Sequence, residues 1–131
     1  MTNAVAVPDM KLELVPIPVS DVDRAKKFYE QVGFVNVHDN QISPQMRVVQ
    51  LTPPGSTCAI VFGTGMGPNT EMEPGSVKGV HLVVDDIEES RNALIERGVE
   101  ISTAEDLGGG VMYAWFSDPD GNLWTLQQWP K

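Results

Sequence analysis

Few side chains in this sequence are suited to chemistry, and His81 is the first of them. It lies in an apolar run at 79–84, and an imidazole that titrates near neutral pH can serve as a base, an acid or a metal ligand. Thr125 and Gln127 lie two residues apart in a second apolar run at 122–128, so they share one face of an extended strand. We predict that these three side chains line a pocket. The more common role of such a histidine, a hydrogen-bonded pocket or core residue, stands beside the roles of base and ligand.

Aromatic residues in the second half of the chain favour a binding pocket. Tyr113 and Trp115 share one face of a predicted strand at 111–117, and the internal repeat described below aligns Gln50 with Trp115. Flat rings with a few polar groups suit a small organic ligand. We expect this ligand to be aromatic, because rings stack on one another, or cationic, because ring faces also attract cations. The alternative is that these rings fill the core or a dimer interface.

The composition narrows the function classes. The chain has 131 residues and 41% hydrophobic residues, which fits one globular domain. It carries 18 acidic and 9 basic side chains, so nucleic acid is not an expected partner. We also expect no membrane association and a cytoplasmic location, because apolar runs are far shorter than the roughly 18 residues of a membrane helix and no basic residue opens a secretory signal.

Nucleophilic and nucleotide chemistry find little support. The single cysteine, Cys58, excludes an internal disulfide and a cysteine-rich zinc site. The three glycines at 108–110 are not followed by the lysine of a phosphate-binding loop. We therefore expect these glycines to form a flexible loop near the mouth of the pocket.

The residues above are placed by an internal repeat. At one constant offset, Asp21 matches Asp86, Tyr29 matches Leu94 and Gly33 matches Gly98. Ser20 or Asp21 is the predicted N-cap of the first helix, and Gly33 its C-cap. The first module is predicted to contain a strand at 11–19, a helix at 22–32 and strands at 34–38, 46–52 and 57–62. The second is predicted to contain a strand at 79–84, a helix at 87–97 and two or three further strands, at about 99–102, 111–117 and 122–128.

These elements predict an α+β fold of two tandem βαβββ modules. The modules span about 11–62 and 79–129, within a single domain over residues 1–131. A linker at 63–78, rich in glycine and proline, connects them, and residues 1–10 form a loose leader. The prolines at 16 and 18 predict that the first strand is interrupted or lies at an edge.

Several short motifs resemble the vicinal oxygen chelate superfamily of glyoxalases, bleomycin-resistance proteins and dioxygenases. They are PVSDVDRA at 18–25, FY at 28–29, GF at 33–34 and SDPDGN at 117–122. The resemblance implies two modules whose mixed sheets curl around a shared cavity, which a homodimer usually completes. It also implies metal ligands at four strand positions, which fall here on Leu14, Ala59, Gly79 and Thr125.

Those four residues cannot form the usual metal site, since Leu, Ala and Gly offer no donor and a neutral Thr is a poor one. The resemblance therefore implies no metal or other cofactor, and a protein similar to bleomycin-resistance proteins that binds a small molecule without chemistry. The alternative is a glyoxalase-like lyase, isomerase or dioxygenase. Such an enzyme would use a displaced metal site at His81 and Gln127, or metal-free acid–base chemistry at His81. Whether the chain is an enzyme stays open at this point.

Overall fold

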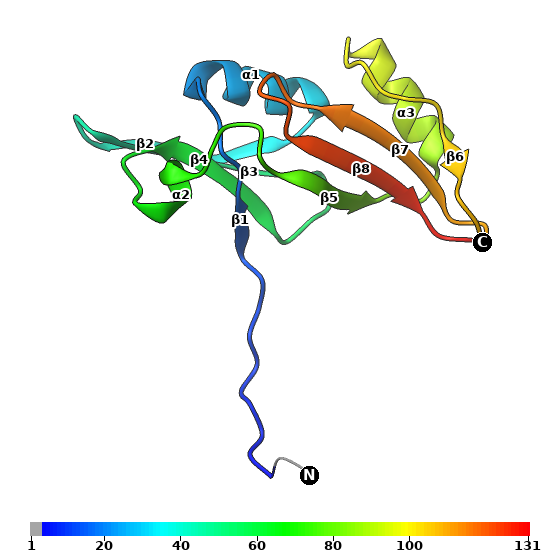
Figure 1. Ribbon diagram of the computed structural model, residues 1–131, viewed down its shortest axis with the longest axis horizontal. Helices are drawn as coiled ribbons and strands as arrows, with labels where there is room; N and C mark the ends of the chain where they lie inside the picture. Colours follow the sequence, from blue (N-terminus) through cyan, green and yellow to red (C-terminus); the bar gives the residue numbers. More distant parts are fainter. Residues whose placement is uncertain (1–3) are drawn as a thin grey trace.

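Two modules with the same order of elements follow one another along the chain (Figure 1). The computed structural model describes residues 4–131. The first module contains β1 (Leu14–Pro16), α1 (Val22–Val32), β2 (Val35–Ser43), β3 (Met46–Thr52) and β4 (Ala59–Thr64). The second contains β5 (Lys78–Val83), α3 (Ile87–Glu96), β6 (Glu105–Asp106), β7 (Met112–Ser117) and β8 (Leu123–Gln128). The predicted pair of βαβββ modules is confirmed.

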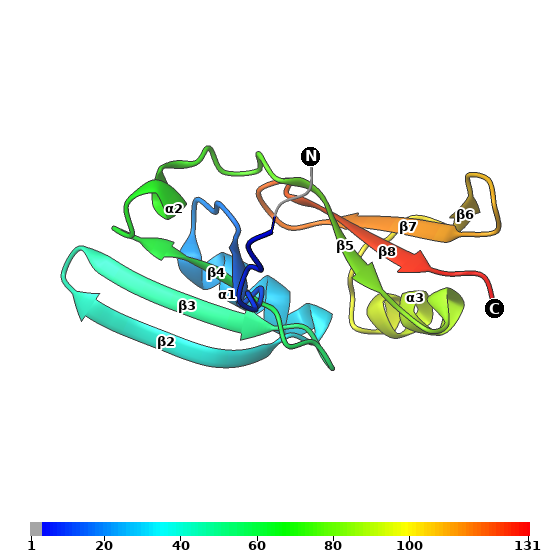
Figure 2. The same cartoon turned by 90° about the horizontal axis from the view of Figure 1, so that it is seen from below.

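Each module forms its own four-stranded mixed sheet. The strand order is β1-β4-β3-β2 in the first sheet and β5-β8-β7-β6 in the second. In both sheets the first strand runs parallel to the last, and the remaining pairs are antiparallel. The sheets lie side by side (Figure 2), and no strand of one sheet pairs with a strand of the other within residues 4–131.

The helices cover one side of both sheets, and the other side is open (Figure 1). Residues 4–13 leave β1 on the open side as an extended segment. In the part of the chain that the structure describes, no helix has the length and apolar character needed to cross a membrane. The face of each sheet that turns away from its helix is therefore available for a ligand or for a second copy of the chain.

Matching caps set the ends of the two long helices. The carboxylate of Asp21 accepts a hydrogen bond from the backbone N–H of Arg24 at the start of α1, and Asp86 accepts one from Glu89 at the start of α3, both at 3.0 Å. Gly33 ends α1 with φ 109°, a left-handed conformation that glycine adopts without a steric penalty. The predicted caps are confirmed, with Asp21 rather than Ser20 at the N-cap.

A single apolar core joins the modules. Tyr29 and Phe34 of the first module pack against Trp124 of the second, with ring centroids 5.7 Å and 5.5 Å from the indole. Phe116 stacks on the other side of this cluster, 6.2 Å from Trp124 and nearly parallel to it. Because both helices and both sheets contribute to this core, the relative position of the modules is fixed by packing.

Three predicted strands of the first module have other bounds in the structure, and one of them, β4, begins and ends two residues later than predicted. β1 is shorter than the predicted strand at 11–19, because Pro16 and Pro18 offer no N–H to a ladder, and it is an edge strand as expected. β2 continues through Asp39 to Ser43, beyond the predicted end of this strand at 38. The Asp39 carboxylate accepts hydrogen bonds from Arg47 at 2.9 and 3.0 Å and from Lys26 at 2.7 Å, so it is satisfied within the strand.

The connections also differ from prediction in two places. The predicted strand at 99–102 does not form. Its backbone pairing with β7 consists of one hydrogen bond, which the N–H of Ser102 donates to the carbonyl oxygen of Trp115 at 2.9 Å. The short strand β6 forms after it instead. The linker contains α2 (Pro68–Glu71), a single helical turn with proline at its first position, where a missing N–H costs nothing.

Candidate functional site

Five of the six predicted site residues lie on one surface, the face of the second sheet that turns away from α3. We call this surface the open face. His81 on β5 and Trp115 on β7 are both register partners of Thr125 on the central strand β8. One step along β8, Gln127 is the partner of Tyr113. Since partner residues project to the same side of a sheet, the five side chains form two adjacent rows across it.

The three rings of the open face contact one another. Tyr113 and Trp115 stack at 6.2 Å with an interplanar angle of 19°, and His81 meets the edge of Tyr113 at 6.3 Å. Thr125 and Gln127, between the aromatic pair and β5, are only 3% and 7% exposed. The surface therefore offers flat apolar area with a hydroxyl and an amide at its centre, the combination that orients an aromatic ligand.

A depression of about 490 Å³ lies over this surface, within the size range of small-molecule sites. Four predicted residues line it: His81, Tyr113, Trp115 and Thr125. The remaining lining residues are Lys78, Gly79, Leu107, Gly108 and Leu123. Gly108 belongs to the glycine loop that was expected near the mouth of the pocket, and the prediction did not include Lys78, Leu107 and Leu123. Gln127 belongs to the same face beside Tyr113 but is not part of the lining.

Gln50 is not brought to this depression. It lies on β3 in the first sheet, where its register partner is Val61. The repeat alignment paired Gln50 with Trp115, and the strand registers correct that pairing. Its counterpart is Tyr113, because β4 and β8 match through Val61 and Gln127. Gln50 thus occupies the corresponding open face of the other module.

The register of β5 changes the interpretation of His81. Leu14 pairs with Ala59 in the first sheet, whereas the partner of Thr125 in the second is His81. A register shift between Lys78 and Val80, at Gly79 with φ 86°, displaces the strand. His81, and not Gly79, is therefore the counterpart of Leu14, and the placement of Gly79 at a ligand position was wrong.

The imidazole of His81 is exposed and contacts its own strand. Its Nδ1 lies 2.5 Å from the carbonyl oxygen of Gly79. A carbonyl can only accept, so Nδ1 carries the proton in this contact, and the neutral ring then has its lone pair on Nε2. His81 can therefore accept a hydrogen bond from a ligand through Nε2.

The residues present do not fit the metal that the superfamily's enzymes hold. With the corrected register, the four positions carry Leu14, Ala59, His81 and Thr125, which supply one imidazole and one hydroxyl. Among residues 4–131, no group of three or more His, Cys, Asp or Glu side chains is placed to bind a metal ion.

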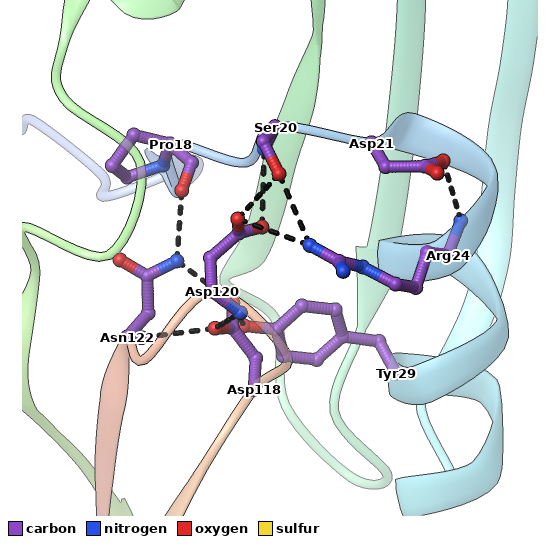
Figure 3. A network of polar contacts seen from close by, with 8 residues as sticks. All are labelled: Pro18, Ser20, Asp21, Arg24, Tyr29, Asp118, Asp120 and Asn122. Carbon is purple, nitrogen blue, oxygen red and sulfur yellow. Dashed lines mark hydrogen bonds and ion pairs between the residues drawn. The ribbon is translucent and has the colours of Figure 1, made fainter.

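The motifs at 18–25 and 117–122 serve a different purpose, which Figure 3 shows. They form a polar network between the modules, the inter-module network, built around the buried carboxylate of Asp118. The Tyr29 hydroxyl donates to this carboxylate at 2.7 Å and accepts a hydrogen bond from the indole N–H of Trp124 at 2.9 Å. Asn122 donates to Asp118 at 2.7 Å and to the carbonyl of Pro18 at 2.8 Å.

The same network continues toward the surface. Asp120 accepts hydrogen bonds from the N–H and hydroxyl of Ser20, at 3.0 and 2.6 Å, and from Arg24 at 3.2 Å. Burial and the neighbouring Asp118 carboxylate raise the pKa of the Tyr29 hydroxyl, which is therefore a hydrogen-bond donor at any physiological pH. These motif residues hold the modules together and do not reach the open face.

The fold and the open face together define a class: two-module α+β proteins with a polar and aromatic sheet surface suited to a small organic molecule. The chain belongs to the Glyoxalase/Bleomycin resistance protein/Dioxygenase superfamily, whose family model matches residues 11–126. The resemblance inferred from the motifs is thereby confirmed. No curated protein matched the chain.

Solved structures of similar proteins agree with this membership. An antibiotic-binding protein from Streptomyces sp. CB03234, TnmS3, is 36% identical over 96% of this chain and 100% of its own, with a TM-score of 0.80. A glyoxalase/bleomycin resistance protein from the same organism is 38% identical over 90% and 100% of the two chains, with a TM-score of 0.73. A superfamily member from Sphaerobacter thermophilus DSM 20745 is 35% identical over 93% and 99%, with a TM-score of 0.78.

Proposed function

We propose that the chain binds a small aromatic organic molecule on the open face and holds it without chemical change, as an antibiotic-sequestering protein does. The observation that carries the proposal is the stacked pair of Tyr113 and Trp115 beside the buried hydroxyl of Thr125. The rings supply apolar contact area, and the hydroxyl fixes the orientation of a polar substituent. The similarity to the antibiotic-binding TnmS3 supports the same function.

A homodimer forms part of this proposal. The open faces of both sheets carry apolar side chains that the single chain leaves uncovered, including Val35 at 61% and Val83 at 63% exposure. A second copy placed over these faces would enclose the depression and shield the ligand from water. Gln50 would then come to the ligand from the partner, as a polar group on the opposite wall. Sedimentation or light scattering across a range of concentrations measures the expected dimer.

The test of the function combines binding with recovery of the ligand. Isothermal titration with bleomycin, an anthracycline and simple naphthalene derivatives measures affinity, and mass spectrometry of the recovered compound detects chemical change. Trp115→Ala should weaken binding of an aromatic ligand by about 5- to 10-fold, since one aromatic contact is worth about 1 kcal/mol. Trp129→Ala is the matched control, because Trp129 is 57% exposed and lies beyond β8.

The proposal fails if no aromatic compound binds, or if Trp115→Ala and Trp129→Ala have equal effects. Recovery of an altered compound would favour the second candidate, an enzyme that uses His81 as a metal-free general base. The exposed position of His81 and the free lone pair on its Nε2 favour this alternative. In that case His81→Gln would abolish turnover and retain binding.

A further inference from the structure

The charges around the depression differ in sign from the charge of the whole chain. The sequence carries a net charge of −9, yet Lys78 is the one formally charged side chain that lines the depression within residues 4–131. Its ammonium group is exposed and donates to the carbonyl of Gly121 at 2.6 Å. An ammonium group has three N–H donors, so two remain for a ligand.

Acidic side chains line other hollows of the surface, and none of them lines the depression. Asp85, Asp86 and Glu89 lie along a groove of about 770 Å³ between α3, β5 and the loop at 53–56. The oxygen Oδ1 of Asp86 already caps α3. This groove borders the depression only at the edge strand β5, where His81 lines both.

Two further carboxylates lie near the open face, and neither lines the depression. Glu105 is the register partner of Tyr113 on the outer strand β6, at the side of the sheet away from Lys78. Asp106 follows it and accepts a hydrogen bond from the N–H of Gly108 at 2.8 Å. The open face is therefore polarised, with donors on the β5 side and a carboxylate at the far edge.

We propose that the ligand of the open face is an aromatic molecule with an anionic group, an ionised phenol or a carboxylate, which lies against Lys78 beside His81. The ring then lies on Tyr113 and Trp115, and the anion reaches the β5 side of the depression. This inference rests on the proposed function and replaces the cationic ligand that the ring faces alone suggested. Lys78 lies on the edge strand β5 and Glu105 on the opposite edge strand β6, about 14 Å away at about 4.8 Å per strand. Charges farther apart than about 8 Å are largely screened at physiological salt, so an anionic group against Lys78 is little affected by Glu105.

The experiment uses three naphthalene compounds of equal ring size: 2-naphthoate, neutral 2-naphthol and the 2-naphthylmethylammonium cation. Isothermal titration at pH 7.5 and 150 mM NaCl compares their affinities for the full chain. We expect 2-naphthoate to bind about two- to fivefold more tightly than the cation, the range of an exposed ion pair. Lys78→Gln should remove this preference and weaken 2-naphthoate binding more than 2-naphthol binding, whereas Lys78→Arg should retain the preference.

Lys27→Gln is the matched control, because Lys27 is an exposed lysine on α1 and does not line the depression. It removes the same charge from the chain and should leave the order of the three affinities unchanged. Tighter binding of the cation, or an equal effect of Lys78→Gln and Lys27→Gln, overturns the inference and leaves aromatic binding intact. Failure of all three compounds to bind overturns the proposed function itself.

Discussion

Removal of the Tyr29 hydroxyl should destabilise the fold far more than the loss of one oxygen atom suggests. Tyr29→Phe deletes the donor to the buried Asp118 carboxylate and leaves the indole N–H of Trp124 without its acceptor. Tyr29 and Trp124 are at most 1% exposed, so water does not replace the lost partners. A hydrogen bond to a charged group is worth about 1.5–3 kcal/mol and an unsatisfied buried donor costs about 1–3 kcal/mol.

Asp118 keeps the donors from Asn122 and from the backbone of Asp120, which limits the damage on that side. We therefore expect a loss of about 2–4 kcal/mol, a large part of the stability of a small domain. Urea unfolding followed by circular dichroism measures this difference, with an unchanged slope m as the sign that only stability has changed.

Tyr113→Phe is the control for this experiment, since Tyr113 is half-buried and its hydroxyl has no hydrogen-bond partner among residues 4–131. It should cost less than about 0.5 kcal/mol. A loss below 1 kcal/mol for Tyr29→Phe, or equal losses for the two variants, would refute the view that the network fastens the modules.

Three further predictions concern pH and backbone geometry. Because burial and Asp118 raise the pKa of Tyr29, the folded protein keeps a proton that the unfolded chain loses near pH 10. Between pH 9 and pH 11 the free energy of unfolding of the wild type should therefore fall by about 1.4 kcal/mol more than that of Tyr29→Phe, as measured by urea titrations. Hydrogen bonds from Arg47 and Lys26 lower the pKa of Asp39, so the ionised carboxylate stabilises the fold above about pH 4, and this stabilisation fades as the pH falls. Asp39→Asn should lower the free energy of unfolding by about 1 kcal/mol at pH 7. An equally large difference between wild type and variant near pH 2 would contradict this role of Asp39. Gly75→Ala should lower the melting temperature much more than Gly67→Ala, although both glycines have positive φ. A Cβ atom at Gly75 would lie 2.1 Å from the carbonyl oxygen of Asp120, whereas a Cβ atom at Gly67 would meet nothing within 4 Å. Equal shifts in melting temperature would refute the close approach at Gly75.

Helices and their caps could be predicted from the sequence because the signals are local. Asp21 and Asp86 cap the first turns through backbone N–H groups three residues later, and Gly33 ends α1 by its own left-handed conformation. Each of these contacts lies within a few residues, so a repeat of the same residue types implies a repeat of the same structure.

Strand register depended on contacts between distant residues and could not be predicted in the same way. The position of His81 is decided by parallel pairing with Thr125 and by a one-residue irregularity at Gly79. A glycine signals that such an irregularity is possible, but the sequence does not state how far it displaces the strand. For the same reason the prediction missed Lys78 as part of the depression and paired Gln50 with the wrong residue of β7.

The separation of the inter-module network from the open face explains why the motifs identify the superfamily and leave the ligand undefined. Asp118, Asn122 and Tyr29 are buried, and each makes at least two hydrogen bonds across the module boundary or within the turn, so substitutions there cost stability. His81 and Lys78 are exposed and contribute little to the core, so other side chains at those positions would leave the fold intact. One scaffold can therefore present many different open faces, and the chemistry of the ligand has to be inferred from the rings, donors and charges of this face in this chain.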